Sequence, residues 1–138
     1  MDTSIPWLGV VLAALSAFPI GSFWYSPAGF LTPWMKMVGS NNDEMKKRFG
    51  PAMGVIAVAS LLTAYVLAHF IRYSQVATGT TGIASGLETA LWSWLGISLT
   101  TVLASGIFEP RSSWVMVITA GNRLVTLLVM GLILGAFM

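Results

Sequence analysis

"SWVMVITAGNRLVTLLVMGLILGAFM" spans residues 113–138, and it decides the fold because nearly all of its residues are apolar or small. An α-helix needs ~20 such residues to cross a hydrocarbon core ~30 Å thick. The stretch therefore predicts a membrane-spanning helix from Trp114 to Phe137. Its single charged residue is Arg123, near the middle. The role of this guanidinium depends on the solvent around the helix.

The rest of the chain fits a lipid solvent. It has 138 residues, of which 56% are hydrophobic and only 9% are charged, whereas soluble domains carry roughly 25% charged residues. Three further apolar runs have the length of a membrane span, and they are Ile5 to Tyr25, Pro51 to Ile71 and Ala84 to Phe108. We predict one all-α membrane domain over residues 1–138, built as a bundle of four transmembrane helices.

The loop between the first two spans, residues 26–50, contains most of the charged residues. Its segment "NNDEMKKRFGP" predicts one or two turns of surface helix that begin at Asn41 and end at Gly50. Pro51 then suits the first turn of the second span. Most tryptophans fall near the predicted boundaries, as in the aromatic belts of membrane proteins.

Basic residues are distributed unequally between the two sides of the predicted bundle. Five lie in the first and third loops, and they are Lys36, Lys46, Lys47, Arg48 and Arg111. The second loop offers only Arg72. The positive-inside rule then predicts cytoplasmic first and third loops and both termini on the non-cytoplasmic side. We expect the first span to be retained, since no Lys or Arg precedes it as in a signal peptide.

Composition also limits the chemistry of the protein. The net charge of +2 is too small for an extended nucleic-acid surface. With no cysteine and one histidine, the chain lacks the ligands that a protein-built metal site needs. No nucleophile–base pair or phosphate-binding glycine loop is present in the sequence. We expect no enzymatic activity, no cofactor, no metal and no nucleic-acid partner.

Small residues recur at helical spacing in all four spans. The stripes of the first and fourth spans consist of Gly9, Ala13, Ala17 and Gly21 and of Gly131 and Gly135. Such stripes let helix backbones approach closely in lipid. They predict either packing within one bundle or, for Gly131 and Gly135, the interface of a homo-oligomer.

Arg123 and its neighbour Asn122 form a candidate polar site inside the membrane. Arg123 lies about ten residues, or ~15 Å, from the start of its span. An arginine at that depth costs a few kcal/mol, so we expect it to face the bundle interior or a helix interface. Either the guanidinium joins helices through carbonyls, hydroxyls or Asn122, or it binds an anion or a lipid headgroup in a wet cavity.

Two other polar pairs stand near the predicted ends of spans. His69 and Glu88 both fall near the outer interface, where they form a candidate pair across the hairpin. The pair is either a satisfied interfacial contact or a proton- or cation-sensitive site. Glu109 and Arg111 flank Pro110, and they form a candidate structural corner or a docking point for a partner.

Several tracts together resemble a known family of small bacterial membrane proteins, the domain of unknown function 1761. They are "GSFWYSPAGF" at residues 21–30, Trp34–Met35, "WLG" at residues 94–96, "FEPR" at residues 108–111 and the apolar pattern of residues 120–135. The resemblance implies four membrane helices and no particular activity. Two positions depart from the family pattern. Asn122-Arg123 stands where an aromatic residue is expected, and Pro110 stands where glycine or another residue is expected.

These observations favour a non-enzymatic, multi-pass protein of the bacterial cytoplasmic (inner) membrane. Its partners would be the lipid bilayer and other membrane chains, because it would act as a homo-oligomer or as an accessory subunit of a larger complex. The alternative is a transporter or channel for a small solute or ion, using Arg123 and Asn122 with His69 and Glu88. An enzyme acting on lipid is a distant third hypothesis.

Overall fold

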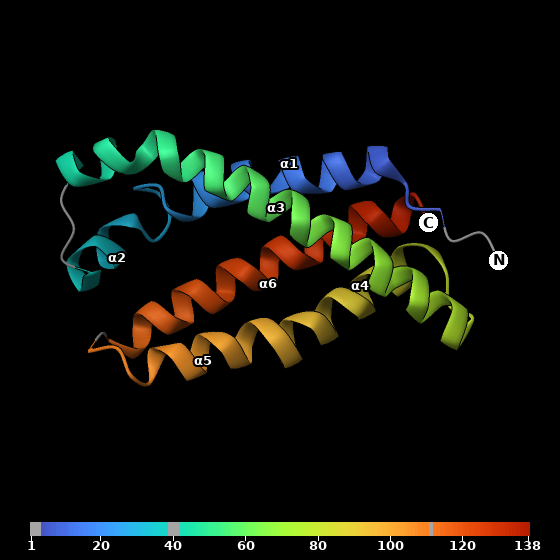
Figure 1. The fold of residues 1–138 in the computed structure, drawn as a ribbon. Helices are drawn as coiled ribbons and strands as arrows, with labels where there is room; N and C mark the ends of the chain where they lie inside the picture. The colour runs from blue at the N-terminus through green and yellow to red at the C-terminus, as the bar shows by residue number, and fades with distance from the viewer. Residues whose placement is uncertain (1–3, 39–41, 111) are drawn as a thin grey trace.

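The computed structural model describes residues 4–38, 42–110 and 112–138, and no strand occurs among them. The elements are α1 (Trp7–Trp24), α2 (Leu31–Val38), α3 (Asn42–Thr78), α4 (Gly82–Ser93), the π-helix η1 (Trp94–Leu99), α5 (Thr100–Gly106) and α6 (Ser113–Ala136) (Figure 1). Four helical stretches are long and apolar enough to cross a membrane: α1, α3, α6 and the continuous rod α4–η1–α5. The predicted all-α fold with four membrane helices is therefore confirmed.

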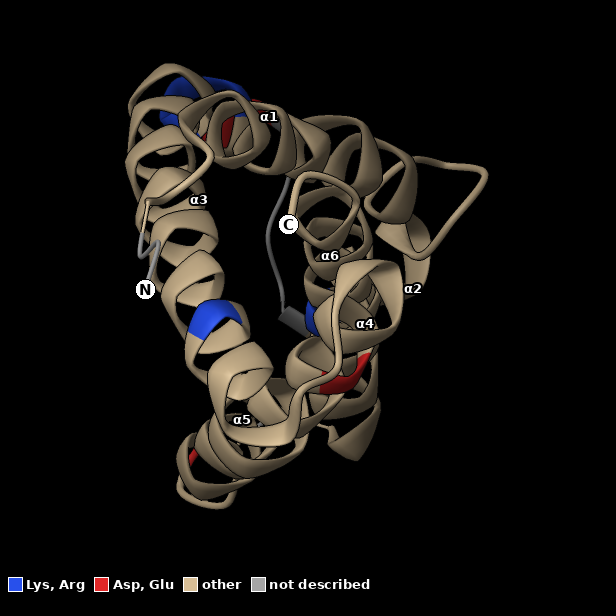
Figure 2. Cartoon of the chain, turned by 90° about the vertical axis from the view of Figure 1, so that its right-hand side faces the viewer, with Lys and Arg blue, Asp and Glu red and all other residues tan. Residues whose placement is uncertain are grey.

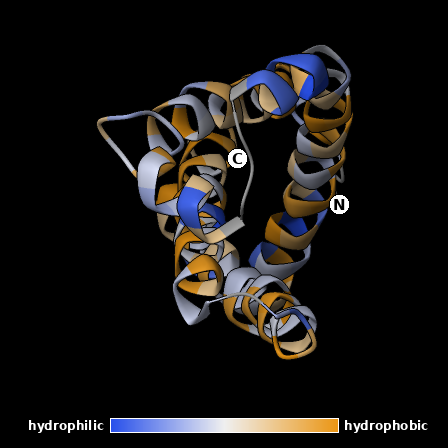
Figure 3. Ribbon diagram, turned by 90° about the vertical axis from the view of Figure 1, so that its left-hand side faces the viewer, coloured by the Kyte–Doolittle hydropathy of each residue, from blue (hydrophilic) through white to orange (hydrophobic). Residues whose placement is uncertain are grey.

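The four long helices run lengthwise, and the start of α1 and the end of α6 lie at the same end of the bundle (Figure 1). The central element is α6, which packs most extensively against α4 and also contacts α1 and α3. Figure 2 shows α6 flanked by α1 and α4 in a view along the bundle. Hydrophilic residues gather at the end that holds α2 and the start of α3 (Figure 3).

The second span differs from its prediction because α3 is one helix of 37 residues. Gly50 and Pro51 lie inside it, where the sequence suggested a break between a surface helix and a span. The turn around them is exposed, so water or headgroups can bond the carbonyl that a proline leaves without a donor. At 1.5 Å per residue α3 is about 55 Å long. It therefore extends well beyond a ~30 Å core.

The turn between α3 and α4 is shorter than its polar sequence suggested. Thr78 ends α3, and the positive φ angles of Gly79 (74°) and Gly82 (69°) reverse the chain. A side chain at either glycine would be strained, since L-residues rarely adopt this conformation. At the opposite end of the bundle Ser112 caps α6, its hydroxyl accepting from the backbone N–H of Trp114.

Glycines bring α4 and α6 into backbone contact. A Cβ on Gly131 would lie 2.5 Å from the carbonyl oxygen of Gly86 and 2.7 Å from the Ala90 Cβ. A Cβ on Gly135 would lie 2.7 Å from the carbonyl oxygen of Gly82. Gly131 and Gly135 are thus already covered by α4 of the same chain.

The stripe of small residues on α1 is used unevenly. Gly9 and Ala13 are buried and Ala17 is half-buried. A Cβ on Gly9 would lie 3.1 Å from the ring of Phe137, which follows α6. Gly21 has open space beside it instead. The stripe therefore packs against the bundle at the start of α1, whereas Gly21, at its other end, has no close neighbour among the described residues.

Candidate functional site

A groove of about 330 Å³ runs between the η1–α5 stretch and α6. Its polar lining consists of Ser98, Thr101, Ser105 and Glu109 on one side and Thr119 and Arg123 on the other. Its apolar lining includes Ile97, Val102, Val115 and Met116. The guanidinium that the sequence places inside the membrane is therefore exposed at a groove within the chain.

The immediate neighbours of Arg123 differ from those expected. Within residues 4–38, 42–110 and 112–138 its guanidinium makes no hydrogen bond, and its side chain is exposed. Tyr25 lies within electrostatic reach of Arg123 and within hydrogen-bonding reach of the Thr119 side chain. The groove, the arginine and this tyrosine thus share one region at the end of α1.

Asn122 does not assist Arg123. Its side-chain nitrogen is buried and lacks a hydrogen-bond partner in the described part of the chain. Consecutive residues on an α-helix point about 100° apart, because one turn takes 3.6 residues. Asn122 therefore faces another side of α6 and does not line the groove that contains Arg123.

The hydroxyl groups that line the groove differ in whether their proton is already donated in a hydrogen bond. The Thr101 hydroxyl donates to the carbonyl of Ile97 at 2.6 Å, and that of Ser105 donates to the carbonyl of Thr101 at 2.9 Å. Such bonds to the preceding turn leave the oxygen as an acceptor only. The Ser98 hydroxyl makes no such bond among the described residues. Ser98 and Arg123 therefore keep hydrogen-bond donors available at the groove.

Two tryptophans attach neighbouring helices to α6 close to the groove. The indole N–H of Trp24 donates to the carbonyl of Ile118 at 3.0 Å, and that of Trp94 donates to the carbonyl of Ala120 at 2.9 Å. Gly121 makes room for the first ring, since a Cβ there would lie 3.0 Å from Trp24. Sequence reasoning assigned most tryptophans to the membrane interface and missed these bonds.

The π-helix η1 explains why the groove opens where it does. Its six residues follow α4 directly, and π-turns hold more residues than α-turns. The face of the rod that packs on α6 is therefore displaced at η1. Beyond it α5 has one buried residue, Val102, whereas α4 packs through Ser85, Gly86, Thr89 and Ala90. The looser contact of α5 with α6 leaves space for the groove.

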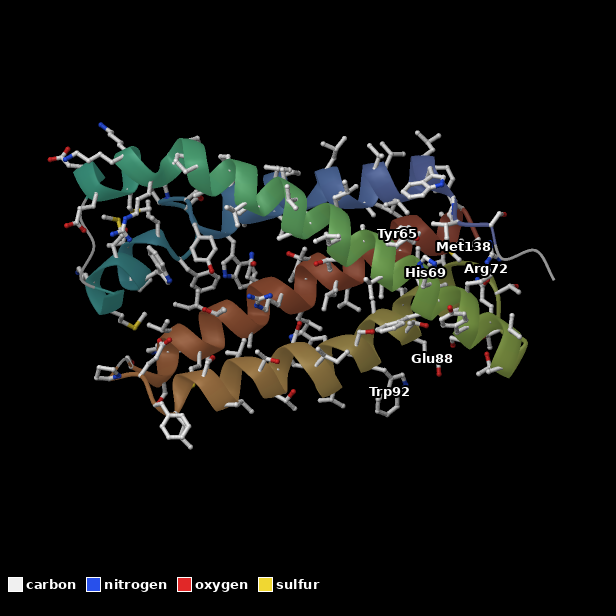
Figure 4. The ribbon with its side chains drawn as sticks, in the orientation of Figure 1. Tyr65, His69, Arg72, Glu88, Trp92 and Met138 are labelled. Carbon is white, nitrogen blue, oxygen red and sulfur yellow. The ribbon has the colours of Figure 1, made fainter. Side chains whose placement is uncertain are left out.

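His69 and Glu88 are not joined by a hydrogen bond or an ion pair, although both are described. The Nδ1 atom of His69 bonds the carbonyl of Tyr65 at 3.0 Å, so it is the donor. The His69 ring also packs edge-on against Tyr65, with 4.5 Å between centroids. Glu88 and Trp92 are exposed side chains of α4, and Figure 4 shows the Trp92 ring pointing away from the bundle.

A polar network at the end that holds the termini was not predicted. Arg72 donates to the carbonyl of Ser4 at 2.9 Å and to the side-chain oxygen of Gln75 at 3.2 Å. The buried Gln75 donates in turn to the Ser85 hydroxyl at 2.9 Å. Figure 4 shows Arg72 at the same end as Met138. The lone basic residue of this end was the signal that could have suggested the network.

The predicted corner of Glu109 and Arg111 is only partly visible, since Arg111 lies outside the described residues. Glu109 is exposed and lines the groove, and its backbone N–H donates to the carbonyl of Gly106 at 3.3 Å. The adjoining Phe108 is 90% exposed. This corner therefore forms one end of the groove that contains Arg123.

Comparison with known proteins supports the resemblance noted in the sequence. Searches of curated proteins and of solved structures find no similar protein. A family model described as protein of unknown function (DUF1761) matches residues 8–135, which include all four long helices except their outermost residues. The chain therefore belongs to this family.

Proposed function

We propose that this protein binds a small anionic group inside the membrane, at the guanidinium of Arg123. One observation carries the proposal: the side chain is exposed in a groove of about 330 Å³ and has no hydrogen bond within the described residues. The groove is at the small end of the range for ligand sites. Binding of this kind suits a solute-binding or transport protein better than an enzyme.

Electrostatics supports an anion as the ligand. An arginine in the middle of a membrane helix costs a few kcal/mol unless partners or water reach it. Its planar fork of N–H donors matches the two oxygens of a carboxylate or phosphate. Such charge-assisted pairs are stronger than bonds between neutral groups. The described part of the chain gives the Arg123 guanidinium no hydrogen bond. A bound anion would supply that partner and offset the cost of placing the arginine in the membrane.

The orientation of the protein decides from which side this site is reached. With five basic residues in the first and third loops against one in the second, we propose that both termini lie on the non-cytoplasmic side. The groove end at Glu109 would then face the cytoplasm. The protein would reside in the bacterial cytoplasmic membrane.

Association with another membrane chain is the competing proposal. A carboxylate from a second copy or from a partner subunit would also match an exposed guanidinium. This arrangement supplies the same charge and closes the groove, so it would turn Arg123 into an interface residue.

The two proposals differ in what stabilises the purified protein. Sodium phosphate or sodium acetate, compared with sodium chloride at equal ionic strength, should raise the unfolding temperature in neutral detergent. Occupancy at 100 times Kd would contribute about 2.7 kcal/mol. Arg123→Leu should abolish the effect, and Lys36→Leu, which removes a surface charge, should retain it. Equal responses of wild type and Arg123→Leu would contradict anion binding. A change of oligomer mass in Arg123→Leu without any anion effect would favour association.

A further inference from the structure

We infer that the anionic group at Arg123 is the head of a single-chain amphiphile that enters the groove from the bilayer, its chain lying along the apolar lining. This inference rests on the proposed function and names the class of ligand for the same groove. Three features of the groove support it: the placement of its donors, its apolar lining and its open side.

Among the described residues that line the groove, Arg123 and the Ser98 hydroxyl have hydrogen-bond donors to give. The Tyr25 hydroxyl lies close to Arg123 and Thr119. Farther along, Thr101 and Ser105 have given their protons to carbonyls of their own helix. A compact, fully hydrated anion needs donors on several sides when it leaves water. A ligand with one charged end needs them only at that end.

The remaining lining is suited to a hydrocarbon chain. Ile97, Val102, Val115 and Met116 present apolar groups to the groove. Each methylene that leaves water contributes about 0.8 kcal/mol, and a chain gains this on entering the bilayer, since lipid tails are as apolar as these side chains. The chain therefore acts by concentrating the head in the membrane beside Arg123, and the apolar lining accepts it without a desolvation cost.

The groove is also accessible from the side. Its wall η1–α5 is a single helical layer that packs on α6, and Val102 is the one buried residue between Trp94 and Gly106. Ile97, an apolar residue of the groove lining, is 56% exposed, and the Arg123 side chain is exposed as well. A ligand already dissolved in the bilayer can therefore reach Arg123 without crossing water.

Native mass spectrometry of the purified protein in a neutral detergent tests the inference with three probes. Glycerol 3-phosphate supplies the head alone, 1-oleoyl lysophosphatidic acid supplies head and chain, and monoolein supplies the chain alone. We expect a one-to-one adduct with lysophosphatidic acid at total concentrations where glycerol 3-phosphate gives none, and no comparable adduct with monoolein.

Three variants connect the adduct to the groove. Arg123→Leu removes the charge, and Ser98→Leu keeps Arg123 but places a larger side chain in the groove that both residues line. Both should lose the lysophosphatidic acid adduct, while Lys36→Leu should keep it. Should Arg123→Leu fail to fold, Ser98→Leu and Arg123→Lys still test the site.

The outcomes separate the inference from the proposed function. Equal affinity for glycerol 3-phosphate and lysophosphatidic acid would overturn the amphiphile inference and leave anion binding intact. Equal affinity for monoolein, or an adduct that survives both Arg123→Leu and Ser98→Leu, would overturn it as well. If neither phosphate probe binds, anion binding at Arg123 is itself refuted.

Discussion

Replacement of Gly131 by alanine should separate α4 from α6, because the two backbones touch at this residue. The new Cβ would lie 2.5 Å from the carbonyl oxygen of Gly86 and 2.7 Å from the Ala90 Cβ, whereas ordinary contact begins at 3.4 Å. The backbone carbonyl cannot rotate away as a flexible side chain would. The helices must therefore move apart by nearly 1 Å.

The size of the effect follows from two opposing terms. Overpacking of a close-packed contact costs typically about 1–3 kcal/mol. Alanine also favours the helix over glycine by up to about 1 kcal/mol, which offsets part of that cost. We expect Gly131→Ala to lower the free energy of unfolding by about 1–2 kcal/mol.

Gly54→Ala provides the matched control, since Gly54 lies in helix α3 with no atom within 4 Å of its ideal Cβ. This change keeps the propensity gain and lacks the clash, so it should be neutral or stabilising by up to about 1 kcal/mol. Unfolding can be followed by circular dichroism during titration of detergent-solubilised protein with sodium dodecyl sulfate. If Gly131→Ala proves as stable as Gly54→Ala, the backbone contact between α4 and α6 does not exist as described.

Five further substitutions test other parts of the fold and the topology. Trp24→Phe and Trp94→Phe each remove an indole donor to α6, and each should lower the free energy of unfolding by about 0.5–1.5 kcal/mol; unchanged stability would contradict these bonds. Gln75→Leu leaves two partners of a buried amide without their bonds, so thermal unfolding should show a loss of about 1–3 kcal/mol. For topology, Thr80→Cys should react with an impermeant thiol reagent in intact cells and Asp43→Cys should not, since the chain has no other cysteine; the reverse result would invert the proposed orientation.

Prediction from sequence succeeded where the signal is local along the chain. Four apolar stretches appear as α1, α3, α4–η1–α5 and α6. Errors arose at helix ends: α3 continues through Pro51, although a proline normally opens or breaks a helix. The exposed position of that turn, which weakens the effect of the lost hydrogen bond, is a tertiary property.

Prediction of the candidate site was weaker, because it required the rotation of each helix about its axis. Hydropathy identified Arg123 as unusual, and the structure places it in a groove with Thr101 and Glu109. The same reasoning paired His69 with Glu88, which the structure does not join. In lipid most faces of a helix are apolar, so hydropathy alone does not tell which face meets a neighbour.

Hydropathy summed along continuous stretches is enough to count the membrane helices and to mark the unusual depth of one arginine. Which residues meet across helices follows from the packing of the folded bundle. It placed Gly131 against Gly86 and left Arg123 open to a groove beside the π-helix. The reason is that helix association in lipid depends on close packing and hydrogen bonds between particular faces, and both depend on geometry that hydropathy does not contain.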